Sequence, residues 1–234
     1  MSRTFPTPDQ AAFVFDLDGT LVDSVYQHVI SWQEALRDVG IELSVWRIHR
    51  KIGMSGGLFM QGVLRELREA GREFTDQEVE QLHNLHASHY LPRVPEIQPL
   101  PGARELLAHL SEAGIPWSIA TSGRRVGAAP MLEKLEVDPQ HPMVTRDEVK
   151  RAKPDPDLFL AGAAVLDMAP SNCIVVGDSI WDMLAARRAG ALGVGLLSGG
   201  YGENELERAH AFRVYADPWD LLSHLDELGI RAER

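Results

Sequence analysis

The pattern of apolar and polar positions divides the chain into a short opening strand, a helical stretch and a long alternating region. Phe13, Val14 and Phe15 form an apolar run of strand length that leads directly into two acidic residues. Residues 21–95 look helical throughout and predict helices at 25–39, 45–52, 58–70 and 75–90. The last of these begins with the capping-box pattern Thr75-x-x-Glu78, which is typical of a helix start.

From about residue 101 onward, strand and helix patterns alternate, as they do in βαβ units of a parallel sheet. The expected strands lie at residues 117–121, 173–178, 193–197 and 212–215. The expected helices lie at residues 103–113, 126–135, 157–166, 179–189 and 218–228. Ligands of open α/β sheets bind beyond the carboxyl ends of the strands. The sequence therefore predicts an α/β fold with a Rossmann-like parallel sheet and a functional site at that edge.

Composition and charge narrow the class of partner. The chain has 234 residues, 44% of them hydrophobic, and a formal net charge of -11. Nucleic acids and anionic membranes attract clustered Lys and Arg, so we expect neither as a partner. The single cysteine, Cys173, cannot form an intrachain disulfide, and no apolar run approaches a membrane span. These features favour a protein of the cytoplasm.

Two carboxylates follow the opening strand at Asp16 and Asp18, separated by Leu17 and followed by Gly19-Thr20. Strand side chains alternate between faces, so Asp16 can point into a crevice beyond the sheet while Leu17 turns back to the core. Asp18 then rejoins Asp16 at the crevice. Asp and Gly are common in turns, but two acids with Gly-Thr after a buried strand indicate an acidic site.

Later segments supply the remaining parts of a phosphoryl-transfer site. A second apolar strand ends in Thr121-Ser122-Gly123, which offers hydroxyl groups and a glycine. Lys153 lies in a stiff proline-containing loop just before a helical pattern. A third strand ends at Asp178, and Asp182 follows four residues later, one helical turn on.

At this point the chain resembles the haloacid dehalogenase-like (HAD) hydrolase superfamily, in its phosphatase branch with a helical cap. Four motifs carry the resemblance, and they occur in the family's order. They are Asp-x-Asp-Gly-Thr at residues 16–20, a hydrophobic strand ending in Thr121, Lys153-Pro154, and Gly177-Asp178-x-x-x-Asp182. The second and third motifs are weak when taken singly, but the four together cover the core domain and are specific.

The chemistry of a phosphate monoester explains why these residue types occur together. The ester is anionic and its transition state spreads charge over the phosphoryl oxygens, so catalysis is mainly positioning and charge neutralisation. A hard cation, Mg²⁺ by preference, can bridge carboxylate and phosphate oxygens, with Asp16 and Asp178 as a sparse ligand set. Lys153 adds a fixed positive charge, and Thr121 offers a hydroxyl and a backbone N–H.

The resemblance adds the assignment of roles. It implies that Asp16 is the nucleophile that forms an aspartyl-phosphate. It implies that Asp18 is the general acid/base, and that its backbone carbonyl also ligates the metal. Asp178 would ligate Mg²⁺ directly, and Asp182 would orient waters or Lys153, although an acid in a first helical turn has a dipole role of its own. The residues expected to bind the phosphate group are Gly19, Thr121, Ser122 and Lys153.

The resemblance also implies a domain division, with a discontinuous core at residues 1–21 and 97–234 and a helical cap at residues 22–96. Closure of such a cap would exclude water and would need hinges near residues 21–24 and 92–99. The cap loop supplies Met54, Ser55 and Gly56 as candidate substrate-recognition residues. Arg124 could meet a second anionic group of the substrate or could equally be a surface residue at a helix start.

Several functions remain open at this level. The favoured one is a Mg-dependent phosphatase acting on a small phosphorylated metabolite of the phosphoglycolate or sugar-phosphate type, as a monomer or homodimer. A β-phosphoglucomutase-like phosphotransferase is the alternative, but members of that group carry Glu-Asp where this chain has Gly177-Asp178, and a cap arginine where it has Gly56. A non-catalytic binding module is disfavoured because no motif is degraded.

Two further patterns are near-misses. Gly53-Met54-Ser55-Gly56-Gly57 matches the Gly-x-Ser-x-Gly elbow of serine hydrolases, with Ser55 as nucleophile, but the residues before it are too basic for a buried strand. His83, His86 and His89 recur every third residue, a spacing that walks around a helix and does not suit a zinc site. We expect these histidines to face solvent or to pack within the cap.

Overall fold

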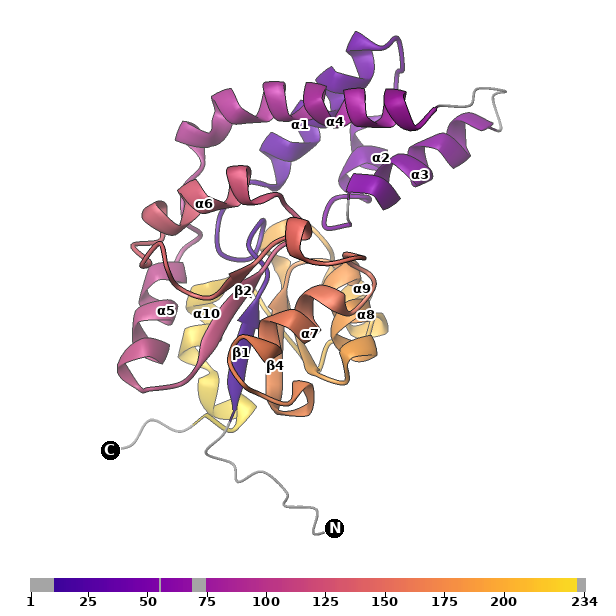
Figure 1. Cartoon of the computed structure of the whole chain (residues 1–234). Helices are drawn as coiled ribbons and strands as arrows, with labels where there is room; N and C mark the ends of the chain where they lie inside the picture. The colour runs from indigo at the N-terminus through magenta and orange to yellow at the C-terminus, as the bar shows by residue number, and fades with distance from the viewer. Residues whose placement is uncertain (1–10, 55, 69–74, 231–234) are drawn as a thin grey trace.

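The computed structural model describes residues 11–54, 56–68 and 75–230. Figure 1 shows two parts: a sheet with helices on both sides, and a group of helices that lies over one end of the sheet. In the sequence, the helical group lies between the first and second strands. The predicted α/β class is therefore confirmed.

The sheet has six parallel strands in the order β3-β2-β1-β4-β5-β6. The strands are β1 (Ala12–Phe15), β2 (Trp117–Ala120), β3 (Met143–Val144), β4 (Cys173–Gly177), β5 (Leu192–Leu196) and β6 (Arg213–Tyr215). The chain order runs one way from β1 to β3 and the other way from β4 to β6. Such a reversal leaves a crevice at the carboxyl ends of the two central strands, here β1 and β4.

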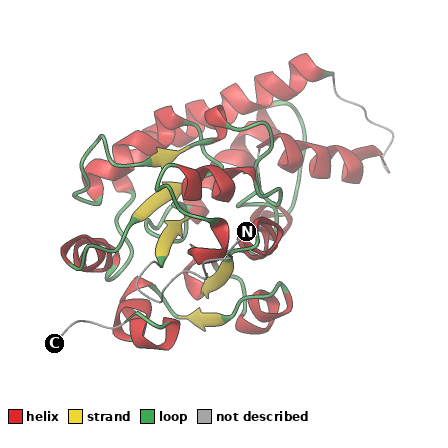
Figure 2. Cartoon of the chain, turned by 60° about the horizontal axis from the view of Figure 1, so that its bottom comes forward, coloured by secondary structure: helices red, strands yellow, loops and turns green. Residues whose placement is uncertain are grey.

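Helices cover both faces of the sheet, as Figure 2 shows. Phe13 and Phe15 of β1 point to one face and belong to a buried cluster with α5, α6 and α10, whereas Ala12 and Val14 point to the other and pack against α7 and α8. Burial on both sides explains the continuous apolar run that predicted this strand. These helices are α5 (Ala103–Glu112), α6 (Arg125–Lys134), α7 (Asp157–Ala164), α8 (Ile180–Ala189) and α10 (Pro218–Ser223).

The residues between β1 and β2 form what we call the helical insertion, residues 22–96. Its elements are α1 (Val25–Asp38), α2 (Val45–His49), α3 (Gly56–Arg68), α4 (Asp76–Tyr90) and a 3-10 helix, η2 (Leu91–Glu96). Trp32, Ile48, Phe59 and Leu82 belong to an apolar cluster separate from those of the sheet. A separate core supports the proposed domain division at residues 22–96.

Two chain segments connect the insertion to the sheet and lie side by side. The N–H of Asp23 donates to the carbonyl of Gln98 at 2.9 Å, and the N–H of Leu100 donates to the carbonyl of Leu21 at 2.9 Å. These residues fall in or beside the two hinges proposed from the sequence. Among the helices that the structure describes, none combines the length and the apolar character that crossing a bilayer would require.

The elements differ from the prediction at a few places. The helix expected at residues 218–228 ends at Ser223, and a 3-10 helix follows at η6 (Leu225–Leu228). Strand β3 and helix α9 (Glu203–Arg208) were not predicted, and neither were the short 3-10 helices. The predicted helix at 58–70 begins two residues earlier at Gly56, and its last two residues lie outside the described part. The capping box at Thr75 and Glu78 is present.

Candidate active site

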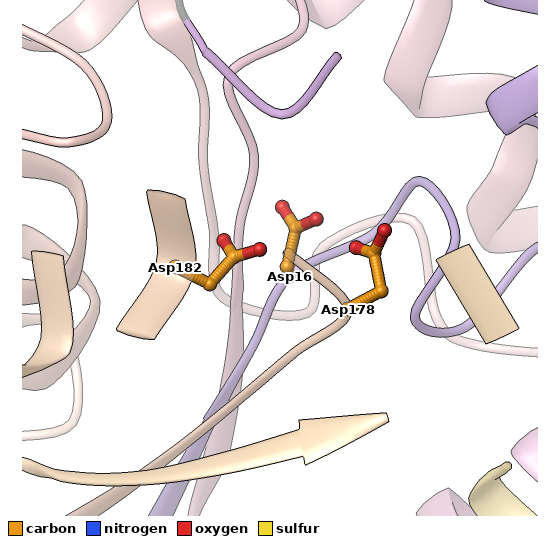
Figure 3. A group of neighbouring side chains, drawn as sticks. All are labelled: Asp16, Asp178 and Asp182. Atoms are coloured by element: carbon orange, nitrogen blue, oxygen red, sulfur yellow. The ribbon is translucent and has the colours of Figure 1, made fainter. Parts of the chain in front are cut away.

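Three buried aspartates meet at the carboxyl ends of β1 and β4. Asp16 directly follows β1, and its N–H donates to the carbonyl of Val176 at 2.9 Å, which fixes the end of the strand. Asp178 directly follows β4, and Asp182 lies in the first turn of α8. Figure 3 shows the three side chains converging, and one carboxylate oxygen from each lies within 4.8 Å of the others. The crevice predicted by the strand order is therefore acidic.

Asp182 has two structural tasks. Its carboxylate accepts the N–H of Ser179 at 3.0 Å, and the Ser179 hydroxyl caps the helix in return, so the pair forms a capping box. Its other oxygen lies 2.8 Å from the ammonium of Lys153. The first-turn role and the role beside Lys153, which the sequence left as alternatives, thus occur together in one side chain.

Lys153 is fully buried and forms ion pairs with both Asp16 and Asp182. Its ammonium also lies 4.9 Å from the centre of the Phe159 ring. Burial alone would lower the pKa of Lys153, but the two carboxylates raise it, so the side chain stays charged. A buried lysine with two acidic partners is a fixed positive charge at the end of the sheet.

The acids of the crevice repel one another. Burial raises the pKa of Asp16 to about 7, with Asp182 and Asp18 adding to the rise and Lys153 opposing it. Burial also raises the pKa of Asp178 well above its usual range, with Asp182 and Asp16 adding to it. Lys153 lowers the pKa of both carboxyl groups, but not enough to reverse the rise. Carboxylate oxygens at close quarters are the donors that Mg²⁺ prefers, so the residues present fit that ion.

Asp18 has a different environment, shared with the helical insertion. The Ser24 hydroxyl donates to its carboxylate at 2.5 Å, and the His28 ring nitrogen Nε2 lies 3.2 Å from the same oxygen. Burial would raise the pKa of Asp18, but His28, Ser24 and Lys153 together hold it below its usual value. Sequence reasoning missed Ser24 and His28. A signal exists, since the two are four residues apart at the start of α1 and so share one helix face.

The residues predicted to bind phosphate are close to this group. The Thr121 hydroxyl lies 3.5 Å from Asp18 Oδ2, but the Thr121 N–H donates to the carbonyl of Val144 and is not available to a ligand. The Gly19 N–H likewise donates to the carbonyl of Val22 at 2.8 Å. Ser122 donates through its hydroxyl to the carbonyl of Gly53, which belongs to the insertion. The phosphate-binding roles of these residues stay predictions. In Thr121 and Ser122, the hydroxyl group would be the donor to the phosphate.

A loop after β5 that was not predicted to take part completes the crevice. Gly199 lies so close to Asp178 that a Cβ at this position would overlap the carboxylate. The Thr20 hydroxyl donates to Asp178 at 3.2 Å, and the Ser198 hydroxyl donates to the carbonyl of Gly19 at 2.6 Å. The strand predicted at residues 193–197 thus corresponds to β5, and the loop that follows it supports the site.

The same loop contacts the helical insertion. The His49 ring donates to the carbonyl of Gly199 at 2.8 Å. The Arg50 guanidinium pairs with both carboxylate oxygens of Glu205, at 3.2 and 2.5 Å, and stacks on the Tyr201 ring at 4.2 Å. These contacts hold the insertion against the carboxyl end of the sheet.

A cavity of about 780 Å³ lies between the sheet and the insertion. The acidic site forms part of its wall through Asp16 and Asp18, and Met54 and Arg124 also line it. Ser55 lies outside the described residues, and Gly56 is the first residue of α3. The described residues before this loop form α2 and a turn, without the strand that a serine-hydrolase elbow needs.

Two of the three regularly spaced histidines pack inside the insertion, and the third forms ion pairs on it. His86 stacks on Trp32 with ring centres 4.2 Å apart, and burial lowers its pKa well below the usual value. His83 meets the edge of the same tryptophan, and His89 pairs with Glu34 and Asp38. Packing within the insertion, one of the two placements expected for them, therefore holds for His83 and His86.

Comparison with known proteins agrees with this geometry. A family model described as haloacid dehalogenase-like hydrolase matches residues 10–190. Hexitol phosphatase A of Escherichia coli (strain K12) is 37% identical over 76% of this chain and 79% of that protein. β-Phosphoglucomutase of Bacillus subtilis (strain 168) is 29% identical over 80% and 84%. A crystal structure of a hydrolase from Pseudomonas syringae superposes with a TM-score of 0.90 at 54% identity, covering 94% of this chain and 99% of that one.

Proposed function

This chain belongs to the haloacid dehalogenase-like hydrolase family and is a phosphoric monoester hydrolase, and we propose that it releases phosphate from a small phosphorylated metabolite through an aspartyl-phosphate on Asp16. One observation carries the proposal. The carboxylate that ends the central strand lies in contact with a buried lysine, between two further buried acids and at the wall of the cavity between the sheet and the insertion.

In the proposed reaction, a carboxylate oxygen of Asp16 attacks phosphorus and the bond to the leaving oxygen breaks. Asp18 gives its proton to that oxygen, then takes one from the water that attacks the aspartyl-phosphate and regenerates Asp16. Lys153, which pairs with Asp16, would neutralise charge on the phosphoryl group once that group is bound to Asp16. Ser24 and His28 favour the ionised form of Asp18 and so lower its pKa. To act as the acid, Asp18 must therefore be protonated when the substrate binds and the insertion closes over it.

We propose Mg²⁺ as the cofactor, held by Asp16, Asp178 and the backbone carbonyl of Asp18. The crowded, pKa-raised carboxylates of Asp16 and Asp178 support this ligand set. When bound, the ion would neutralise the phosphoryl oxygens and the acids that face them. Asp182 would take part indirectly, because it is already engaged by Lys153 and Ser179.

We propose that the helical insertion is a cap that closes over the substrate. The contacts of Ser24 and His28 with Asp18 support this role, because they couple the position of the insertion to the acid/base residue. Met54 and Arg124, which line the cavity, stay candidates for substrate contact together with Ser55 and Gly56. The cytoplasmic location and the monomeric or homodimeric state stay predictions.

A phosphotransferase resembling β-phosphoglucomutase is the second candidate, because such an enzyme is similar over most of the chain. It would return the phosphoryl group to a sugar without releasing phosphate. The two functions separate in one assay that follows both free phosphate and the isomer composition of a sugar phosphate.

The experiment that tests the proposal is phosphate release from a panel of phosphorylated metabolites, with Mg²⁺ and with EDTA. We expect release in Mg²⁺ and a loss of at least about 100-fold in EDTA, because removing the ion leaves the facing acids unneutralised. Equal rates in both conditions would contradict the metal-dependent site. Isomerisation of a sugar phosphate without net phosphate release would favour the phosphotransferase.

A second expected result concerns Gly199. In Gly199→Ala, the added methyl group would overlap the Asp178 carboxylate and displace it, and a misplacement of about 1 Å at such a site costs about 100-fold in rate. Steady-state kcat/KM measures the effect. Gly202→Ala is the matched control, since a Cβ there meets its nearest neighbour at 3.5 Å. Full activity in Gly199→Ala would show that Asp178 tolerates displacement and would count against its role.

A further inference from the structure

A polar stripe on α4 lines the cavity beside the acidic site. Glu80, His83, Asn84 and Ala87 all form part of the wall. Positions separated by three and four residues share one helix face, so these side chains face the cavity together. None of the four sequence motifs includes them, and their chemistry is independent of phosphate binding.

The core side of the same region carries Arg124 and Arg146. Arg124 Nη2 lies 3.7 Å from Glu80 Oε1, which brings the two sides of the cavity together. Glu80, His83, Arg124 and Arg146 line the same cavity, and the three charged groups act on the pKa of His83. Burial is the largest cause and lowers that pKa, which keeps the His83 ring neutral at pH 7.

The cations in this region are engaged by neighbouring groups, two of them by acids. Arg124 faces Glu80, and Lys51, which also lines the cavity, lies 2.5 Å from Glu66. Arg146 donates to the carbonyl of Val149 at 2.7 Å. A substrate carboxylate would meet the acid Glu80 as well as these engaged cations. The region therefore does not favour a leaving group with a second negative charge.

The hydrogen-bonding groups on the stripe suit hydroxyls instead. A neutral imidazole and a carboxamide each offer both a donor and an acceptor, and a hydroxyl needs both. Glu80 adds an acceptor and Arg124 a set of donors. Trp32 and Phe59, stacked with ring centres 4.3 Å apart, give the same cavity an apolar wall for the carbons of such a molecule.

The volume of the cavity agrees with a leaving group larger than a two-carbon acid. A volume of about 780 Å³ is typical of pockets that enclose drug-sized ligands and exceeds what phosphate with a two-carbon acid would fill. We infer that the leaving group is a neutral polyhydroxylated carbon chain or ring, of the sugar or alditol class, and that Glu80, His83 and Asn84 on α4 determine this specificity. The inference rests on the proposed function, because it names the substrate class of the same site.

The test compares kcat/KM for three compounds in Mg²⁺: sorbitol 6-phosphate, phosphoglycolate and p-nitrophenyl phosphate. The parent protein is expected to prefer sorbitol 6-phosphate over phosphoglycolate by at least about tenfold. In Asn84→Ala, the ratio of kcat/KM for sorbitol 6-phosphate to that for p-nitrophenyl phosphate should fall about tenfold, the cost of losing one hydrogen bond to the substrate. Glu80→Gln should lower the same ratio and serves as a second variant.

Gln81→Ala is the matched control, because Gln81 is an exposed side chain on the same helix and is absent from the cavity wall. Its ratio should equal that of the parent. A preference for phosphoglycolate, or an equal fall of the ratio in Gln81→Ala, would overturn the inference and leave the phosphatase standing. No phosphate release from any of the three compounds would overturn the proposed function and the inference with it.

Discussion

Asp16→Asn should release no measurable phosphate from any substrate while keeping its fold. The substitution preserves shape and removes the nucleophilic charge, and the loss of a nucleophile typically costs 10⁴-fold or more, on the order of that seen for other covalent enzymes. Lys153 would keep its ion pair with Asp182, so the buried ammonium is not left without an acidic partner. Phosphate release under saturating substrate, together with circular dichroism, measures both parts of the expectation.

The control for this experiment is Asp226→Asn, which removes a carboxylate from an exposed side chain. Its activity should match that of the parent. Turnover by Asp16→Asn at a rate near that of the parent would exclude an aspartyl-phosphate on Asp16. Inactivity caused by unfolding would appear as lost helical signal, and that outcome would instead assign Asp16 a structural role.

Lys153→Met should lose both stability and activity. The lysine is fully buried between Asp16 and Asp182, and breaking a buried ion pair by removing one partner typically costs about 3–5 kcal/mol, because the remaining charges lose their compensation. We therefore expect the free energy of unfolding to fall by about that amount at pH 7, measured by urea denaturation. Loss of the fixed positive charge should also lower kcat by about 100-fold or more.

Lys150→Met is the matched control, since Lys150 is exposed and lies three residues away in the same loop. Its stability should differ from that of the parent by less than about 0.5 kcal/mol. If Lys153→Met unfolded at the urea concentration of the parent, the buried ion pairs would contribute nothing to the fold. A stable but inactive Lys153→Met would confine the role of the lysine to the reaction.

The sequence was sufficient to predict those parts of the site that depend only on residues adjacent in the chain. A short apolar run ends where Asp16 begins, and another ends at Asp178, so the position of both carboxylates follows from the strand boundaries. Lys153 was predicted to lie near them, but its complete burial was not, because burial depends on how α7 and α8 pack on the sheet. The packing of α8 also explains why Asp182 contacts both Ser179 and Lys153, a combination that was not predicted.

Contacts between distant segments could not be predicted. His28 reaches Asp18 only because the insertion folds back over the sheet, and Gly199 reaches Asp178 from a loop that follows β5. The missed elements have physical reasons too. Strand β3 has two residues, too few to show a period, and α9 is a six-residue polar helix with one buried apolar residue, Leu206. A pattern that short cannot be separated from a loop.

The strand order has a consequence for how the chain folds. The central strand β1 is made first, but its neighbours come much later, since Phe13 pairs with Trp117 on one side and with Ile174 on the other. Contacts so distant in sequence close large loops and slow folding, whereas helices of the insertion form from local contacts. The strand that bears Asp16 therefore has no partner strand until residue 117 has been made, and it stays at an edge of the sheet until residue 174 follows. The catalytic end of the sheet is then assembled late, after the helical insertion that covers it has formed.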